Sequence, residues 1–92
     1  MYRITEIITI EPYQISARFN SGEIRMINFL PLVEKFTALK DPKVFAKAKI
    51  DSFPTISWDD LAFIRELDGT IKTCPLDFSP ETLYLLSVAQ SN

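Results

Sequence analysis

Residues 14–29 carry the feature that most limits what this chain can fold into. The segment QISARFN alternates apolar and polar side chains, with Ile15, Ala17 and Phe19 on one side, which is the period of a half-buried β-strand. The turn residues Asn-Ser-Gly follow, and a second segment of strand type, EIRMINF, comes directly after them. Gly22 can take the positive φ that a tight turn requires. The pattern therefore predicts a β-hairpin, and with it a fold that contains an antiparallel sheet.

A third strand is predicted immediately before this hairpin. Residues 2–10 are rich in β-branched side chains, and the alternation places Ile4, Ile8 and Ile10 on one face. The residues Glu-Pro-Tyr then interrupt the pattern. The first third of the chain is therefore predicted to be a three-stranded antiparallel meander.

Two short helices are predicted in the middle of the chain. The segment at 30–36 has a proline near its start and suits one or two helical turns. In the segment DPKVFAK, Asp41 is a candidate N-cap and Pro42 occupies the first helical position, where its missing N–H costs nothing. Phe45 is expected to anchor this second helix to the sheet.

The rest of the chain predicts further hairpin strands and a final helix. Short extended pieces are expected at 48–50 and 55–58, and the segments AFIREL and TIKTC flank Asp68-Gly69, a strong hairpin signal. The segment PETLYLLSVAQ, residues 80–90, is predicted to be a C-terminal helix. We therefore predict the α+β class, with a largely antiparallel β-sheet and one domain over residues 1–92.

The stretch DFSPETLY, residues 77–84, contains a serine, an acid and a tyrosine, and it raises the question of a catalytic loop. Its spacing is also that of a helix start, with Ser79 as N-cap and Pro80 at the first helical position. Phe78 and Leu83 have the spacing of a hydrophobic staple across the cap. We interpret the stretch as structural.

Composition excludes several classes of chemistry. The 92 residues include no histidine and one cysteine, Cys74. A serine–histidine–acid triad and a structural zinc site are thereby excluded, and a cysteine nucleophile lacks its usual base. We predict no catalytic residue, no metal site and no cofactor. The N-terminus has no signal-peptide pattern and no segment has the length of a membrane span, so we expect a cytoplasmic protein that does not enter the membrane.

Asp59 and Asp60 are the one adjacent acid pair, and they leave an alternative open. In a loop they could bind Mg²⁺ or Ca²⁺ together with Glu66, Asp68 or Asp77. Nothing in the spacing selects that arrangement, and a solvated turn is the default interpretation. A metal-dependent enzyme that uses carboxylates alone is therefore the third of our functional hypotheses.

The charges are unevenly distributed, although the net charge is only −2. A basic segment carries four lysines that could dock an acidic partner or a phosphate backbone: Lys40, Lys43, Lys47 and Lys49. The default interpretation is a solvated face. Phe45 and Trp58 lie near these lysines in sequence, but we expect both to be core residues rather than base-stacking platforms.

Several motifs in the same order resemble a known bacterial family, the domain of unknown function 2442. They are FNSGEIR (19–25), NFLPL (28–32), LKDPKVF (39–45), KID with TISW (49–51 and 55–58) and DFSPETLY (77–84). The resemblance implies a small bacterial α+β domain without an established enzymatic activity. It also implies a link to helix-turn-helix domains or to toxin–antitoxin-like partners. We expect no DNA-binding appendage in this chain, so any DNA role would come from a partner.

The chain departs from the family pattern in two places. About fifteen extra residues, 61–75, separate the tryptophan strand from DFSPETLY and contain the Asp68-Gly69 turn. In addition, Asp59-Asp60 stands where the family often has Pro-Asn-Gly. We therefore predict an inserted β-hairpin at 61–75.

Our leading hypothesis is a non-enzymatic protein-interaction or regulatory module. Edge strands recruit partners by strand addition, and both residues 2–10 and the hairpin at 62–73 are candidates. A protein partner is expected, or a homodimer formed through an edge or through the C-terminal helix. The alternative is a nucleic-acid accessory protein that uses the four lysines.

Overall fold

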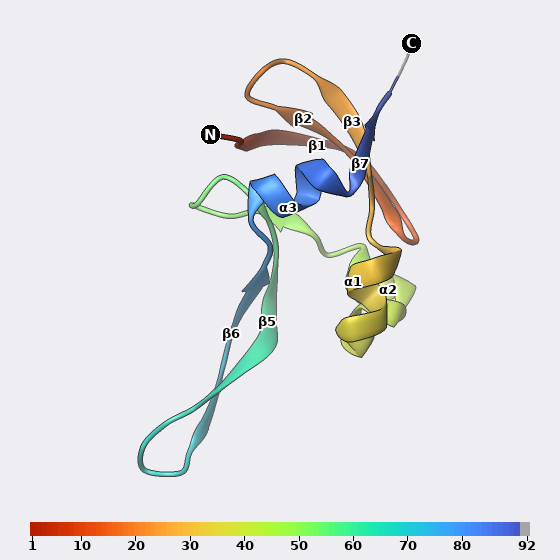
Figure 1. Ribbon diagram of the computed structural model, residues 1–92. Helices are drawn as coiled ribbons and strands as arrows, with labels where there is room; N and C mark the ends of the chain where they lie inside the picture. The colour runs from red at the N-terminus through yellow and green to blue at the C-terminus, as the bar shows by residue number, and fades with distance from the viewer. Residues whose placement is uncertain (91–92) are drawn as a thin grey trace.

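The computed structural model describes residues 1–90, and over this range the chain forms two antiparallel sheets connected by short helices (Figure 1). Their strand orders are β1-β2-β3-β7 and β4-β5-β6. The strands are β1 Ile4–Glu11, β2 Gln14–Phe19, β3 Ile24–Asn28, β4 Lys49–Ile50, β5 Ile56–Arg65, β6 Ile71–Asp77 and β7 Ser87–Ala89. The helices are α1 Leu30–Lys35, the 3-10 helix η1 Thr37–Lys40, α2 Pro42–Phe45 and α3 Pro80–Leu85. The predicted α+β class is confirmed.

The N-terminal meander forms as predicted. β2 pairs with β1 on one side and with β3 on the other, and Ile15, Ala17 and Phe19 are buried on its inner face. Gly22 has a φ of 93° in the turn between β2 and β3, a region that glycine enters without steric cost. The turn residue and the alternation together fix the register of this hairpin.

The predicted face of β1 is wrong in one position. Ile4 is buried and Ile10 packs against the core, but Ile8 is 41% exposed and Ile7 contacts the core instead. The register with β2 shifts between Ile4 and Glu6 and again between Ile7 and Thr9. Each irregularity adds a residue to one strand and so reverses which side chains face inward.

The helical segment between β3 and β4 covers an aromatic core. Asp41 caps α2 by accepting a hydrogen bond from the backbone N–H of Lys43 at 2.9 Å, as predicted. Phe45 is fully buried, and its ring centroid lies 5.5 Å from that of Phe29 and 5.6 Å from that of Trp58. The indole N–H of Trp58 donates to the backbone carbonyl of Phe45 at 3.0 Å. The predicted core roles of Phe45 and Trp58 are confirmed.

The prediction of a helix through residue 90 is wrong. α3 ends at Leu85, and Ser87–Ala89 forms β7, which pairs with β3. The hydroxyl of Ser87 donates to the carbonyl of Tyr84 at 2.6 Å, and the Nε of Arg25 donates to the same hydroxyl at 2.6 Å. β3 offers an unpaired edge, and these two bonds hold the chain against it, so tertiary contacts override a segment that could also be helical.

The segments predicted as separate strands at 55–58 and 62–67 are one continuous strand, β5. Its register with β6 shifts between Trp58 and Ala62, and Asp60 in that interval has a φ of 58°. Aspartate tolerates this left-handed conformation better than most residues. The irregularity explains why the sequence pattern appears broken there.

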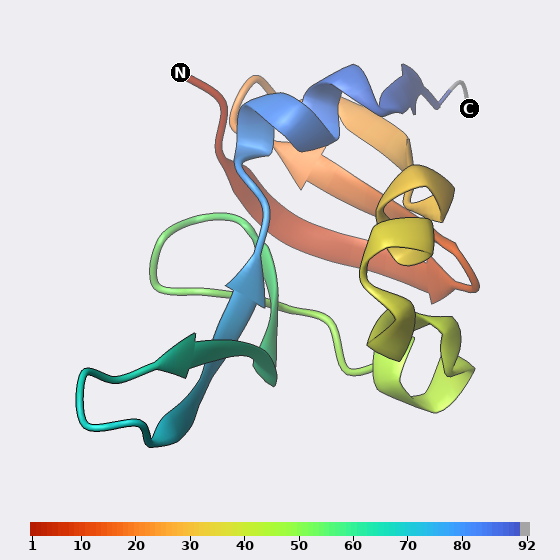
Figure 2. The same ribbon diagram turned by 60° about the horizontal axis from the view of Figure 1, so that its bottom comes forward.

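The β5–β6 hairpin gives the molecule its elongated shape. Figures 1 and 2 show it projecting away from the N-terminal sheet and from the helices, and the overall extents are 51 × 27 × 18 Å. None of the helices in residues 1–90 has the length and apolar character needed to cross a membrane.

Candidate interaction surface

The far half of the β5–β6 hairpin, residues 61–74, is here called the arm. Its turn is closed by hydrogen bonds from the N–H of Glu66 to the carbonyl of Thr70 at 2.8 Å and from the N–H of Gly69 to the carbonyl of Glu66 at 3.1 Å. Gly69 has a φ of 90°. The predicted hairpin at Asp68-Gly69 is therefore confirmed.

The carboxylate of Asp68 stabilises this turn through two hydrogen bonds. It accepts hydrogen bonds from the backbone N–H of Thr70 at 3.0 Å and from its hydroxyl at 2.7 Å. Both bonds favour the ionised carboxylate, and the N–H of Thr70 is the larger influence that lowers the pKa of Asp68 below its ordinary value. The turn is thus more stable when Asp68 is charged.

The ladder register assigns the arm side chains to two faces. Phe63 lies opposite Thr73, and Arg65 lies opposite Ile71. Because side chains alternate along a strand, these four residues share one face. The other face carries the cross-strand pairs Ala62 with Cys74 and Ile64 with Lys72.

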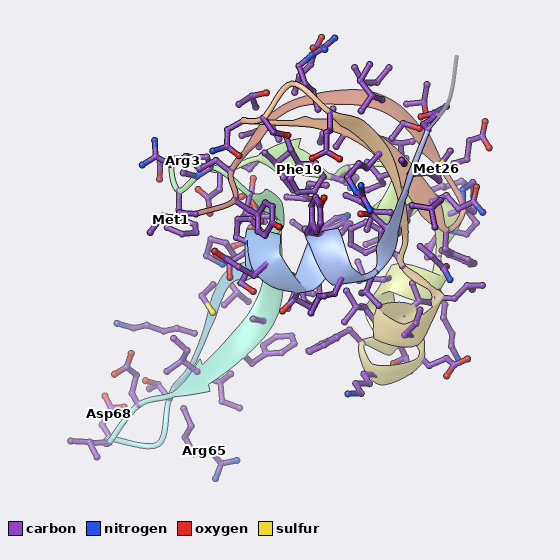
Figure 3. The ribbon with its side chains drawn as sticks, turned by 45° about the horizontal axis from the view of Figure 1, so that its top comes forward. Met1, Arg3, Phe19, Met26, Arg65 and Asp68 are labelled. Atoms are coloured by element: carbon purple, nitrogen blue, oxygen red, sulfur yellow. The ribbon has the colours of Figure 1, made fainter. Side chains whose placement is uncertain are left out.

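Large apolar side chains of the arm are exposed on both faces and at the tip. Phe63 is 70% exposed, Ile71 61% and Ile64 52%, and Leu67 in the turn is fully exposed. Figure 3 shows the arm carrying Arg65 and Asp68 away from the body of the molecule. The arm therefore presents an apolar surface that the rest of residues 1–90 does not cover.

The root of the arm is fixed to the body. Trp58 is buried, and the neighbouring Asp59 carboxylate pairs with the ammonium of Lys49 at 2.9 Å. This hydrogen bond is the largest cause of a raised pKa at Lys49. One step along the strand, Asp60 accepts a hydrogen bond from the hydroxyl of Thr73 at 3.0 Å. The two aspartates thus hold β5 against β4 on one side and β6 on the other.

A small cavity lies beside this root. Its volume is about 160 Å³. It is lined by Val44, Lys47, Trp58, Asp59 and Leu61. The cavity joins the helical segment to the start of the arm. Its lining is mixed, because Val44, Trp58 and Leu61 are apolar whereas Lys47 and Asp59 are charged and exposed.

The four lysines of the predicted patch have different environments. Lys40 and Lys43 are exposed at η1 and α2, and Lys47 borders the cavity. Lys49 is committed to its ion pair with Asp59. The positive charge available to a partner therefore comes mainly from Lys40, Lys43 and Lys47, and their role in binding stays a prediction.

The carboxylates are dispersed. Within residues 1–90, no three His, Cys, Asp or Glu side chains come close enough to hold a metal ion together. Asp59 and Asp60 make the contacts with Lys49 and Thr73 instead. Cys74 is half-buried in β6. Residues 1–90 therefore provide no observation that favours the carboxylate-enzyme alternative.

The stretch DFSPETLY has the structural role that its spacing predicts. The hydroxyl of Ser79 accepts a hydrogen bond from the N–H of Thr82 at 3.2 Å, and Pro80 begins α3 and is buried. Leu83 is fully buried, and the ring centroid of Phe78 lies 6.1 Å from that of Trp58. The capping prediction is confirmed, and the cap attaches α3 directly to the aromatic core.

Sequence reasoning missed one cluster, which is centred on Tyr84. Its ring stacks on that of Tyr2 with centroids 4.1 Å apart, and the guanidinium of Arg25 lies 4.0 Å from the ring centroid of Tyr84. Burial is the main cause of a raised pKa at Tyr84. For Glu23, a hydrogen bond from Ser21 and then the contact with Arg25 lower the pKa. No local pattern could reveal this cluster, because its members are far apart in the sequence.

Comparison with known proteins places this architecture in a family. Residues 4–89 match the family model described as "Protein of unknown function (DUF2442)". The chain belongs to the DUF2442 family. No curated protein and no solved structure matches it. In this DUF2442 protein the matched segment includes both the body and the arm, and the resemblance predicted from the sequence is confirmed.

Proposed function

We propose that this DUF2442 protein is a protein-interaction module that contacts its partner through the arm. The observation that supports the proposal is the exposure of Phe63, Ile64, Leu67 and Ile71 on a hairpin that projects from a well-packed body. Exposed apolar clusters of this kind mark interaction sites in water-soluble domains.

The geometry of the arm favours binding over a purely structural role. A two-stranded ribbon is marginally stable alone and needs a further strand or a packing partner. Beyond its root, this ribbon has neither a further strand nor a packing partner within residues 1–90, because β4 is paired to β5 only at Ile56 and Ser57. A protein that covers the arm would bury its apolar side chains and complete its sheet by strand addition.

Two partner classes are open for the arm: a second copy of this chain, or the small toxin-like or helix-turn-helix protein that the family resemblance implies. The contact surface of either partner should be apolar at the centre, to match Phe63 and Ile71, with an edge strand that can accept backbone hydrogen bonds. The module would then act by binding rather than by catalysis.

Capture from native lysate tests the proposal when arm variants are compared with a matched control. The arm variant carries Phe63→Ser and Ile71→Ser. The control carries Leu85→Ser and Val88→Ser, which are equally apolar and are exposed on α3 and β7. A stoichiometric partner should be retained by the natural chain and the control, and lost by the arm variant. Equal capture by all three proteins would refute the proposal.

A second candidate function, nucleic-acid binding, is supported by Lys40, Lys43 and Lys47. All three are exposed, and within residues 1–90 none of them has an ion pair. Binding of this type should weaken steeply with salt. Salt-dependent binding to an oligonucleotide that disappears with Lys43→Glu and Lys47→Glu, but survives the arm substitutions, would favour it over the arm proposal.

A further inference from the structure

We propose that the partner of the arm is a second copy of this chain, a step that rests on the function proposed above. In this dimer the outer edge of β5 pairs antiparallel with the outer edge of β5 of the second copy, and the two-fold axis passes beside Phe63. The result is a continuous sheet in the order β6-β5-β5-β6. Such an isologous contact closes on itself and stops at two chains.

The other sheet edges are blunted, and the outer edge of β5 is not. β1 has two register irregularities, and the N–H of Ile4 is already bonded to the carbonyl of Pro54 at 2.9 Å. β4 and β7 are only two and three residues long. β6 contains Pro75, which cannot donate to a neighbouring strand. Bulges, short strands and proline are the devices that block edge pairing.

The hydrogen-bonding pattern between β5 and β6 shows which backbone groups of β5 point outward. The N–H of Glu66 bonds to the carbonyl of Thr70 across the ladder. In an antiparallel pair the hydrogen-bonded positions alternate, so Ile64 and Ala62 also direct their backbone groups toward β6. The N–H and carbonyl groups of Leu61, Phe63 and Arg65 therefore point to the open side, where a third strand would bind them.

The available edge pairs over its full length in one symmetric register. It is limited by the irregularity at Asp60 on one side and by the turn that begins after Arg65 on the other. Five residues, 61–65, lie between these limits, and their midpoint is Phe63. In this register Phe63 meets Phe63 of the second copy, and Leu61 meets Arg65. Directly opposed aromatic side chains stabilise antiparallel pairs.

Charge complementarity supports the same register. Arg65 is the last residue of the five-residue edge and Asp60 comes directly before its first, and across residues 1–90 neither of them makes an ion pair. Arg65 shares its face with Thr73, whose hydroxyl donates to Asp60. In this register Arg65 of each copy lies opposite Leu61 of the other, one residue from Asp60, so its long side chain can reach over this face to the Asp60 carboxylate that also accepts from Thr73. Two favourable charge pairs would therefore form for each dimer.

The first experiment measures molar mass by light scattering over a dilution series. The natural chain should be a dimer when concentrated and dissociate on dilution. Arg65→Asp and Asp60→Lys should each weaken dimerisation at least about tenfold, a loss of ~1.4 kcal/mol, because each places like charges together twice. An equimolar mixture of these two variants should dimerise again, since the mixed dimer keeps one natural Arg65–Asp60 pair and restores the other with reversed sign.

Asp60→Asn is the matched control for backbone strain. Asparagine also tolerates the left-handed conformation of this position, with φ at 58°, but it carries no charge. Asp60→Asn should dimerise better than Asp60→Lys, and the mixture with Arg65→Asp should not show full recovery. Recovery as complete as in the mixture of Arg65→Asp with Asp60→Lys would show that the second charge pair is not involved and would overturn the register.

The second experiment fixes the register by cross-linking. Hydrogen-bonded partners in an antiparallel pair have Cα atoms about 5.5 Å apart, a distance that suits a disulfide. In a Cys74→Ser background, Phe63→Cys should therefore cross-link with itself under mild oxidation. Ile64→Cys is the control: it lies opposite Ala62 of the second copy, so its two copies are too far apart. Cross-linking through position 64 rather than 63 would overturn the proposed register.

The outcomes separate this inference from the proposed function. A chain that stays monomeric at high concentration, while the arm variant still loses a captured protein of another sequence, overturns the dimer and leaves the arm as an interaction element. A monomeric chain whose captured proteins do not depend on the arm contradicts both. A dimer that Arg65→Asp leaves unchanged overturns the edge pairing described here.

Discussion

The body and the arm use the same kinds of apolar residues in opposite ways. Phe45 in the body is fully buried against Phe29 and Trp58, whereas Phe63 in the arm is 70% exposed. One strand, β5, runs through both regions, and the irregularity between Trp58 and Ala62 separates them. The apolar side chains of the body therefore stabilise the fold, while those of the arm stay exposed over residues 1–90, which supports their proposed role in a contact.

The comparison predicts that equal changes in side-chain size have unequal effects in the two regions. Removing a buried body side chain leaves a cavity and lowers the free energy of unfolding. Removing an exposed arm side chain changes the folded monomer little and changes binding instead. Variants in each region can therefore show whether this division is real.

The largest effect is expected for Trp58→Ala. Trp58 is 1% exposed and packs against the rings of Phe29, Phe45 and Phe78, so its loss should lower the free energy of unfolding by about 3–5 kcal/mol. In a domain whose total is roughly 5–10 kcal/mol, this is a large share of the stability, and at the lower end of that range much of the population would unfold. Urea denaturation followed by circular dichroism measures this, and a midpoint close to that of the natural chain would place Trp58 outside the core.

A smaller loss is expected for Ser79→Ala. The variant removes the hydroxyl that accepts from the N–H of Thr82 at the start of α3, which should cost about 0.5–2 kcal/mol of stability. Thermal unfolding measures the loss, and Ser79→Asp, which keeps a capping oxygen, is the control. Loss of a measurable activity in a folded Ser79→Ala protein would instead indicate a functional serine.

Phe63→Ser should leave stability nearly unchanged. Because its side chain is mostly exposed, the free energy of unfolding of the monomer should shift by no more than about 0.5 kcal/mol. Denaturation at low protein concentration, where association does not contribute, measures this directly. A loss comparable to that of Trp58→Ala would mean that the arm is part of the core.

The smallest effect is a pH dependence at the tip of the arm. The hydrogen bonds from Thr70 hold the folded pKa of Asp68 below the ordinary aspartate value of 3.8. Their contribution is therefore complete above that value and is lost as the pH falls through the lower folded pKa. NMR shifts of Gly69 and Thr70 should change only in this acidic range, and Asp68→Asn should remove the dependence.

Much of the local structure could be predicted from the sequence because it depends on neighbouring residues. The alternation before Gly22, the caps at Asp41 and Ser79 and the Asp68-Gly69 turn all act within a few positions. Each of them has a backbone conformation or a hydrogen bond that its residue type favours.

What could not be predicted depends on contacts between distant segments. The strand β7 forms because β3 has a free edge and Arg25 bonds to Ser87, and nothing in the last segment alone indicates this. The irregularities of β1 likewise leave no signal in an isoleucine-rich run. The exposure of the arm could not be predicted either. Phe63 and Ile71 have the residue pattern of a half-buried strand, and that pattern is the same whether or not another part of the protein covers them.

Hydrogen exchange of the natural chain at two concentrations tests the division between arm and body most directly. In dilute protein, the outward amides of Leu61, Phe63 and Arg65 should exchange rapidly, while those of the central strand β2 are protected. In concentrated protein, the arm amides should become protected and β2 should not change. Arm amides that exchange at the same slow rate at both concentrations, or a body that loses protection together with the arm, would contradict the account.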